Sequence, residues 1–193
     1  MALPLKYGIL LIGGSAGSMT VLVKLLNQLP SPFPIPVVII LHRLKNVESE
    51  LDKLLSKQQT IAEPEDKEVI LPGHIYLAPQ NYHLLIEDDG TFSLDYAEPV
   101  NFSRPAIDLT FSSAASAFGA RSLGILLSGA NKDGAAGLCR IVQAGGTGIA
   151  QDPDTAGFST MPQAAIDLCP GVQPMAINGM IDFLRNISIA NKS

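Results

Sequence analysis

Short apolar runs bounded by glycine and proline constrain the fold of this chain more than any other feature of its sequence. Five runs recur along the chain: Tyr7–Ile12, Val37–Leu41, Ile75–Ala78, Gly124–Leu127 and Thr147–Ala150. Runs of this length that are apolar throughout indicate strands buried on both faces, as in a mostly parallel sheet. Such a sheet requires helices over both of its faces.

Segments with helical spacing separate these runs. In Ser18–Leu29 the apolar side chains fall on one side of a predicted helix. Further helices are expected over Pro105–Phe118, Ala135–Gln143, Met161–Leu168 and Ile177–Ile187. Pro105 suits a first helical turn, and Gly119 and Gly145 suit helix ends. The alternation predicts right-handed crossovers and a doubly wound, mostly parallel α/β sheet with helices on both faces.

One stretch departs from this alternation. Tyr82–Ile86 and Thr91–Tyr96 flank an Asp89-Gly90 turn, which predicts an antiparallel hairpin. We expect this hairpin at one edge of the sheet. No internal repeat or low-complexity linker interrupts the chain, so residues 1–193 are predicted to form a single domain.

Composition argues against several classes of protein. The chain is 47% apolar and 16% charged, which suits a folded protein with a substantial core. A net charge of −5 with scattered Lys and Arg argues against a nucleic-acid partner. Cys139 and Cys169 are too few and too far apart for a disulfide framework or a zinc site, and we expect buried free thiols and neither metal nor cofactor. The N-terminus has no signal peptide, and no apolar stretch approaches the roughly 18 residues of a membrane span. We therefore expect a soluble, cytoplasmic protein that is not embedded in a membrane.

Three polar residues stand at or just past the ends of predicted strands. Ser15 follows the first run, His42 follows the second, and Asp133 lies in the loop after Gly124–Leu127. In an open α/β sheet, ligands bind beyond the carboxyl ends of the strands. A serine there can act as a nucleophile, with a histidine as its base and an aspartate to orient the histidine.

The loop around Ser15 has the pattern Gly13-x-Ser15-x-Gly17. Small neighbours permit a sharp strand-to-helix turn, which exposes the hydroxyl near free backbone N–H groups that stabilise an oxyanion. A plain or phosphate-binding turn is the alternative. A dinucleotide fingerprint would need glycine where Ile12 stands, and a Walker A loop would need Gly-Lys-Ser/Thr. Both absences weaken a nucleotide-binding interpretation.

His42 is the favoured base among the three histidines. It closes a buried apolar run, where a polar ring has a purpose only if it faces the ligand crevice. His83 opens the hairpin, and His74 lies in a Pro-Gly-His turn. Asp133 would orient His42 and stabilise its protonated form. The alternative for Asp133 is a helix cap just before Gly134.

Many blocks of the sequence, taken in order, resemble the catalytic domain of CheB-type chemotaxis protein-glutamate methylesterases. The resembling blocks are Ile12–Ser15, His42, Gly73–Pro79 with His83-Leu84, Arg104–Asp108, Leu127–Gly129, Asp133–Leu138, Ala150–Pro153 and Met161–Ile166. The order Ser, His, Asp also differs from the Ser, Asp, His order of α/β-hydrolases.

The resemblance implies a serine carboxyl-methylesterase that acts on the cytoplasmic helices of methyl-accepting chemotaxis receptors. The implied reaction is hydrolysis of glutamyl methyl esters with release of methanol, often accompanied by deamidation of receptor glutamines. It implies that Ser15 attacks the ester, that His42 takes the proton, and that Asp133 holds His42. Water then hydrolyses the acyl-enzyme.

The resemblance also implies a set of oxyanion and substrate-binding residues. The backbone amides of Ala16 and Ala130 map to the oxyanion hole, and His83 matches a position close to the site. The family usually has threonine at the position of Ala16 and methionine at that of Ala130. These departures support a second hypothesis, a catalytically degenerate module that binds receptor or signalling helices. A third hypothesis is a small-molecule or nucleotide binder that uses the loop 13–18.

Typical members of the resembling family carry a receiver domain before the catalytic domain. Here the first predicted strand begins within the first ten residues, so we expect the catalytic domain alone. Any regulation would then come from a separate protein.

Overall fold

A computed structural model describes residues 6–42 and 61–189 of the chain. Within these ranges a seven-stranded sheet has the order β3-β4-β2-β1-β7-β8-β9, and every neighbouring pair is parallel. The strands are β1 (Ile9–Gly14), β2 (Val37–Leu41), β3 (Ile61–Ala62), β4 (Ile75–Leu77), β7 (Ser122–Leu126), β8 (Thr147–Gln151) and β9 (Gln173–Met175). All residues of β1, β2 and β7 are buried, as the continuous apolar runs predicted.

The five predicted strands are confirmed within one to two residues at each end, and two further strands were not predicted. β3 has only two residues, and β9 contains Pro174 between the exposed Gln173 and the partly buried Met175. Both strands lie at edges of the sheet, where short strands and proline are tolerated because one side needs no partner. Such segments carry no continuous apolar run for a sequence pattern to detect.

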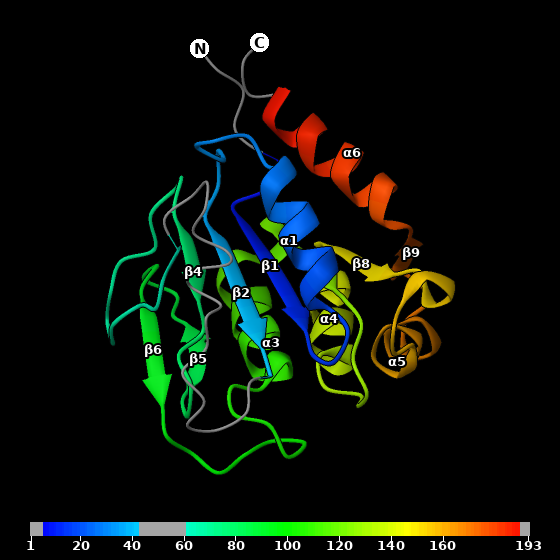
Figure 1. The fold of residues 1–193 in the computed structure, drawn as a ribbon. Coiled ribbons are helices and arrows are strands. Elements are labelled where there is room, and N and C mark those ends of the chain that lie inside the picture. The colour runs from blue at the N-terminus through cyan, green and yellow to red at the C-terminus, as the bar shows by residue number, and fades with distance from the viewer. Residues whose placement is uncertain (1–5, 43–60, 190–193) are drawn as a thin grey trace.

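Helices cover both faces of the sheet, which confirms the doubly wound architecture. They are α1 (Met19–Gln28), α3 (Ile107–Phe118), α4 (Ala135–Gln143), α5 (Thr160–Leu168) and α6 (Ile177–Ile189), with short 3₁₀ turns at Gly119–Arg121 and Pro153–Thr155. In Figure 1, α1 and α6 lie in front of the sheet and α3 and α4 behind it. Gly119 ends α3 with a positive φ, as expected. Pro105 lies before the helix rather than in its first turn, because α3 begins only at Ile107.

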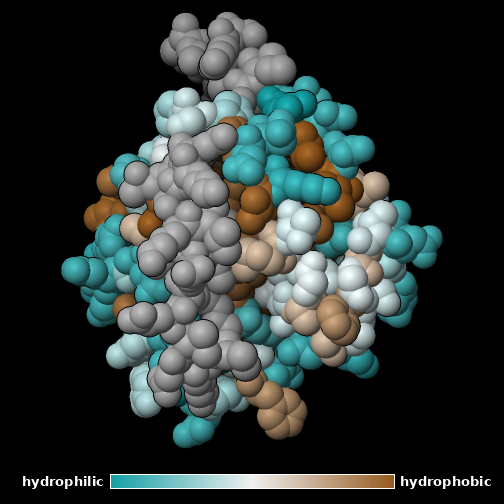
Figure 2. Space-filling model, viewed as in Figure 1, coloured by the Kyte–Doolittle hydropathy of each residue, from teal (hydrophilic) through white to brown (hydrophobic). Residues whose placement is uncertain are grey.

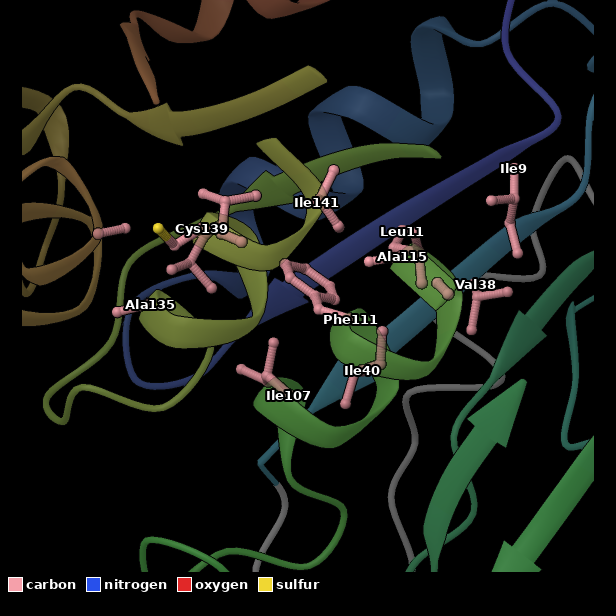
Figure 3. Packing of buried hydrophobic residues seen from close by; sticks show 14 of the residues in the cluster. Ile9, Leu11, Val38, Ile40, Ile107, Phe111, Ala115, Ala135, Cys139 and Ile141 are labelled. Atoms are coloured by element: carbon pink, nitrogen blue, oxygen red, sulfur yellow. The ribbon is translucent and has the colours of Figure 1, made fainter. Parts of the chain in front are cut away.

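Two hydrophobic cores fill the spaces between the sheet and these helices. Alternate residues of β1 contribute to opposite cores: Leu10 and Ile12 pack toward α1 and α6, whereas Ile9 and Leu11 pack toward α3 and α4. Phe111 of α3 lies at the centre of the second core (Figure 3). In the space-filling view, apolar residues show between hydrophilic ones where α1 and α6 lie side by side (Figure 2).

The predicted hairpin is present as β5 (His83–Ile86) and β6 (Phe92–Asp95), joined by a turn through Gly90. It forms a two-stranded sheet of its own instead of hydrogen-bonding to the edge of the main sheet. β5 packs on α3, where Ile86 N–H donates to Ser113 Oγ (3.0 Å). No helix within the described ranges is both long and apolar enough to cross a bilayer.

Candidate active site

The register of β1 and β2 places Ser15 and His42 side by side. Gly14 pairs with Leu41, and the N–H of His42 donates to Gly14 O (3.2 Å). Ser15 and His42 each follow one residue of this pair, so both stand at the carboxyl edge of the sheet. On the other side of β1, Ser15 N–H donates to Ser128 O (2.9 Å) in the loop after β7. Ser15 therefore lies between the ends of β2 and β7, at the point where the strand order reverses.

A tight turn follows Ser15 and leads into α1. Ser18 closes it, because both its N–H (3.1 Å) and its Oγ (2.7 Å) donate to Ser15 O. Gly17 has φ +78°, which glycine adopts without strain. A Cβ on Gly14 would lie 2.7 Å from Ser18 Cβ, and one on Gly17 would lie 2.8 Å from Ser128 Oγ. Gly14 and Gly17 are thus required by close packing, and Ser15 is left half-buried.

His42 and Asp133 are in direct contact. His42 Nε2 lies 2.7 Å from Asp133 Oδ2, and the side chains are 12% and 0% exposed. An ionised carboxylate only accepts hydrogen bonds, so the proton of a neutral His42 is on Nε2. The lone pair of the ring is then on Nδ1, where Ser103 Oγ lies 3.3 Å away. Nδ1 is therefore the nitrogen available to accept a proton.

Asp133 is held by more than His42. Its carboxylate also accepts from the N–H groups of Ile107 (2.7 Å) and Asp108 (3.0 Å) at the start of α3. Burial by itself would raise the pKa of Asp133, but hydrogen bonds from His42 and from these two amides outweigh it and lower the pKa. Asp133 thus caps a helix, but α3 rather than α4, and it contacts His42 at the same time. Its own N–H donates to Asn131 Oδ1 (3.0 Å).

A second carboxylate lies beside Asp133. Asp108 Oδ1 accepts from Gly137 N–H (2.7 Å), and Oδ2 accepts from Asn101 Nδ2 (3.3 Å). Burial, together with the negative charge of Asp133, raises the pKa of Asp108 in spite of these hydrogen bonds. The pKa values of the two neighbouring carboxyl groups are therefore shifted in opposite directions, and Asp133 is the one that stays ionised.

Ala16 and Ala130 are both exposed. In the described part of the chain, neither backbone N–H donates to a protein acceptor. Ala16 O accepts from Ser128 Oγ (2.7 Å), which fixes the peptide that follows it. Two free amide donors at this edge are available for a negatively charged ligand atom.

The structure does not support His83 as a substrate-binding residue. His83 is 0% exposed, and both ring nitrogens are occupied by backbone groups. Nε2 bonds to Glu98 O (3.1 Å), and Nδ1 accepts from Ala106 N–H (3.1 Å). His83 instead ties the hairpin to the segment that precedes α3. His74 is exposed and precedes β4, so it lies at the amino ends of the strands, whereas Ser15 lies at their carboxyl ends.

Two serines at the site had no predicted role. Ser103 contacts the free nitrogen of His42, and only the chain path between β6 and α3 brings it there. Ser128 donates through Oγ to Ala16 O and accepts from Phe158 N–H (2.9 Å), while its N–H donates to Gln151 Oε1 (3.0 Å).

A groove of about 670 Å³ adjoins the site. Asn101, Asp108 and Lys132 line one part of it, and the start of α4 with α5 as far as Leu168 lines the rest. Among the described residues, no group of three His, Cys, Asp or Glu is placed to hold a metal ion. A serine beside a histidine–aspartate pair, with free amides nearby, is suited to nucleophilic acyl transfer.

Comparisons with known proteins find similarity over most of the chain. Residues 10–184 match the family model described as CheB methylesterase. A Leptospira interrogans relative named for protein-glutamate methylesterase and protein-glutamine glutaminase is 44% identical, over 84% of this chain and 86% of that protein. Protein-glutamate methylesterase/protein-glutamine glutaminase 1 of Carboxydothermus hydrogenoformans is 36% identical, over 83% of this chain and 49% of that protein. The crystal structure of the Thermotoga maritima CheB methylesterase catalytic domain is similar with a TM-score of 0.83 and 30% identity, over 95% of this chain and 98% of that one.

Proposed function

Since the chain belongs to the CheB methylesterase family, we propose that it is a protein-glutamate methylesterase in which Ser15, His42 and Asp133 form the catalytic triad. The observation that carries this proposal is the 2.7 Å contact between His42 Nε2 and the buried Asp133. Ser15 follows β1, the strand that pairs with β2 next to His42. A histidine held in one tautomer beside an accessible serine is the arrangement that activates a hydroxyl at neutral pH.

In the proposed reaction, Ser15 Oγ attacks the carbonyl carbon of a glutamyl methyl ester while its proton passes to His42 Nδ1. The tetrahedral intermediate collapses, the C–O bond to the methoxy group breaks, and His42 returns the proton so that methanol leaves. A water molecule then attacks the acyl-enzyme with His42 again as base, releasing the glutamate side chain and free Ser15. Asp133, with its lowered pKa, stays ionised and stabilises the protonated ring.

The amides of Ala16 and Ala130 are proposed to bind the oxyanion of the tetrahedral intermediate. Both N–H groups lack a protein acceptor in the described residues, and Ser128 fixes the Ala16 peptide. Because the donors are backbone groups, the changes of side chain at these two positions leave them in place.

The proposed substrates are glutamyl methyl esters on the cytoplasmic helices of chemotaxis receptors, with glutamine deamidation as a second activity. The names of the relatives, which join methylesterase and glutaminase, support both activities. The proposal places the protein in the cytoplasm, where those helices lie. A degenerate helix-binding module is the alternative, and the intact His42–Asp133 contact favours the enzyme.

The test is methanol release from a methylated receptor cytoplasmic fragment by wild type and by Ser15→Ala. We expect a rate lower by several orders of magnitude in the variant, because a triad without its nucleophile retains only residual catalysis. Ser116→Ala is the matched control, since Ser116 is exposed on α3 and, among the described residues, its Oγ donates to Ser112 O of the same helix. Folded wild type that releases no methanol, or Ser15→Ala with undiminished activity, would contradict the proposal.

A further inference from the structure

A tight turn beside His42 and Asp133 has an unusual backbone. Val100 and Ser103 pair across it, with N–H···O distances of 3.1 Å and 2.9 Å in the two directions. The two residues between them, Asn101 and Phe102, have φ values of 50° and 63°. Two successive left-handed residues are typical of a type I′ turn, in which asparagine and glycine are common. Phenylalanine in this conformation is a genuine outlier.

The side chain of Phe102 gains no contact from residues 6–42 and 61–189 that would offset this cost. Its exposed fraction is 104%, the highest among the exposed large hydrophobic residues of the described chain. An aromatic ring in a strained backbone conformation and in full contact with water is doubly unfavourable. A partner that covers the ring would remove it from water and so offset the cost of the strained backbone.

The position of the turn indicates what that partner is. Ser103, the next residue, lies 3.3 Å from the proposed base nitrogen of His42. In Figure 1 the loop between β6 and α3 runs along the same edge as the carboxyl ends of β1 and β2. A polypeptide that brings an ester to Ser15 and His42 must therefore pass over or beside this turn.

A second exposed aromatic residue lies on the other side of the site. Phe158 is 49% exposed, and its Cδ2 lies 3.2 Å from the position that a Cβ on Gly17 would occupy. Phe158 N–H bonds to Ser128, on the β7 side of Ser15, whereas Phe102 lies on the His42 side. The groove that continues toward α5 begins at Asn101, in the same turn. Apolar surface thus flanks the proposed catalytic residues.

We propose that Phe102 is a specificity-determining residue that contacts a bulky apolar side chain of the substrate helix, one turn away from the esterified glutamate. The proposal rests on the proposed function and specifies the substrate further. On an amphipathic helix, residues three and four positions from the glutamate share its face, so an apolar side chain there meets the ring while the ester is at Ser15. Burial of the ring against such a side chain increases kcat/KM for helices that carry it.

The test compares two synthetic helical peptides that each carry one glutamyl γ-methyl ester. One peptide has leucine three and four residues from the ester, and the other has alanine at the same positions. N-acetyl-glutamate γ-methyl ester serves as a third substrate that has no flanking residues. Methanol release gives kcat/KM for wild type, Phe102→Ala and Phe102→Asn, the last of which tolerates the left-handed backbone without a ring. Val69→Ala is the control, because Val69 is exposed beside the hairpin turn, at the far end of α3 from the site.

For wild type and Val69→Ala we expect kcat/KM to be about tenfold higher for the leucine peptide than for the alanine peptide. In both Phe102 variants we expect this ratio to fall to about one. A variant that only disturbs the turn would lower both rates and leave their ratio unchanged, so the ratio separates docking from a structural role.

Equal rates for the two peptides in wild type, or a ratio that survives in the Phe102 variants, would overturn this proposal while the methylesterase function stands. Failure of folded wild type to hydrolyse all three esters, the small one included, would overturn the proposed function and this inference with it.

Discussion

At the scale of single residues, Asp133 joins two parts of the molecule that are distant in sequence. Its carboxylate accepts from His42 and from two amides at the start of α3. The sequence predicted either a triad member or a helix cap, and the structure gives Asp133 contacts suited to both. The cap is on α3, because the loop after β7 passes the N-terminus of α3 before α4 begins.

Asp133→Asn tests both contributions, because Oδ2 accepts from His42 and from Ile107 N–H, whereas Oδ1 accepts from Asp108 N–H. An amide nitrogen in place of Oδ2 would impose the other tautomer on His42 and leave Ile107 N–H without its acceptor, while the amide oxygen could still accept from Asp108 N–H. We expect kcat for ester hydrolysis to fall by about 10⁴-fold. The loss of a charge-assisted hydrogen bond should also lower the free energy of unfolding by roughly 1.5–3 kcal/mol.

The pH dependence of that stability difference has a definite sign. The pKa of Asp133 is lowered in the folded state, so its stabilising effect is present above the normal aspartate value and is lost as the pH falls through the folded value. Urea unfolding should show a constant gap between wild type and Asp133→Asn at neutral pH that shrinks only below about pH 4. Asp88→Asn, at an exposed position in the hairpin turn, is the control. A gap that closes between pH 7 and 5 would contradict the lowered pKa.

At the scale of elements, the close approach of α3 and α4 positions the site. Gly137 of α4 donates to Asp108 at the start of α3 (2.7 Å). A Cβ on Gly137 would lie 2.7 Å from Phe111 Cβ and 2.8 Å from the backbone O of Asp108. Helix propensity alone would favour alanine at this position, and only the packing of two helices requires glycine.

Gly137→Ala should therefore destabilise the protein by about 1–3 kcal/mol, although alanine is the better helix former by about 1 kcal/mol. Gly179→Ala in α6 is the matched control. Its Cβ would meet only the flexible side chain of Met175, with Cγ at 3.0 Å, so we expect no loss of stability. Thermal and urea unfolding of both variants provide the measurement. Equal effects of the two substitutions would mean that α3 and α4 have room to separate.

At the scale of the whole molecule, one sheet carries two cores, one on each face. Residues of β1 and β2 contribute to both, so loss of either core exposes the same strands. We expect this arrangement to unfold as the single domain that the sequence predicts. Cooperative loss of both cores is the behaviour expected of one domain.

Cys139 provides a probe of that cooperativity. It lies on α4 and is buried, and burial, with the nearby Cys169, raises the pKa of its thiol to about 11. Native protein at pH 8 should not react with iodoacetamide at Cys139. In urea, the midpoint of labelling should coincide with the midpoint of unfolding by far-UV circular dichroism, which measures the helices on both faces of the sheet. Labelling at a clearly lower urea concentration would show that the core beneath α4 opens by itself.

The sequence by itself determined the central strands, the helices and the end of the sheet at which the candidate active site lies. Continuous apolar runs report burial on both faces, and residues after parallel strands meet at one edge whatever the loops do. Ser15, His42 and Asp133 could be proposed together for that reason, although His42 and Asp133 are 91 positions apart.

Only the tertiary structure decided which side chains meet. The short edge strands β3 and β9, the cap that Asp133 gives to α3, the burial of His83 and the contact of Ser103 with His42 all depend on segments distant in sequence. A local pattern reports the burial and backbone preference of its own segment. It carries no information about which donor or acceptor another segment will bring, because that depends on how the elements pack.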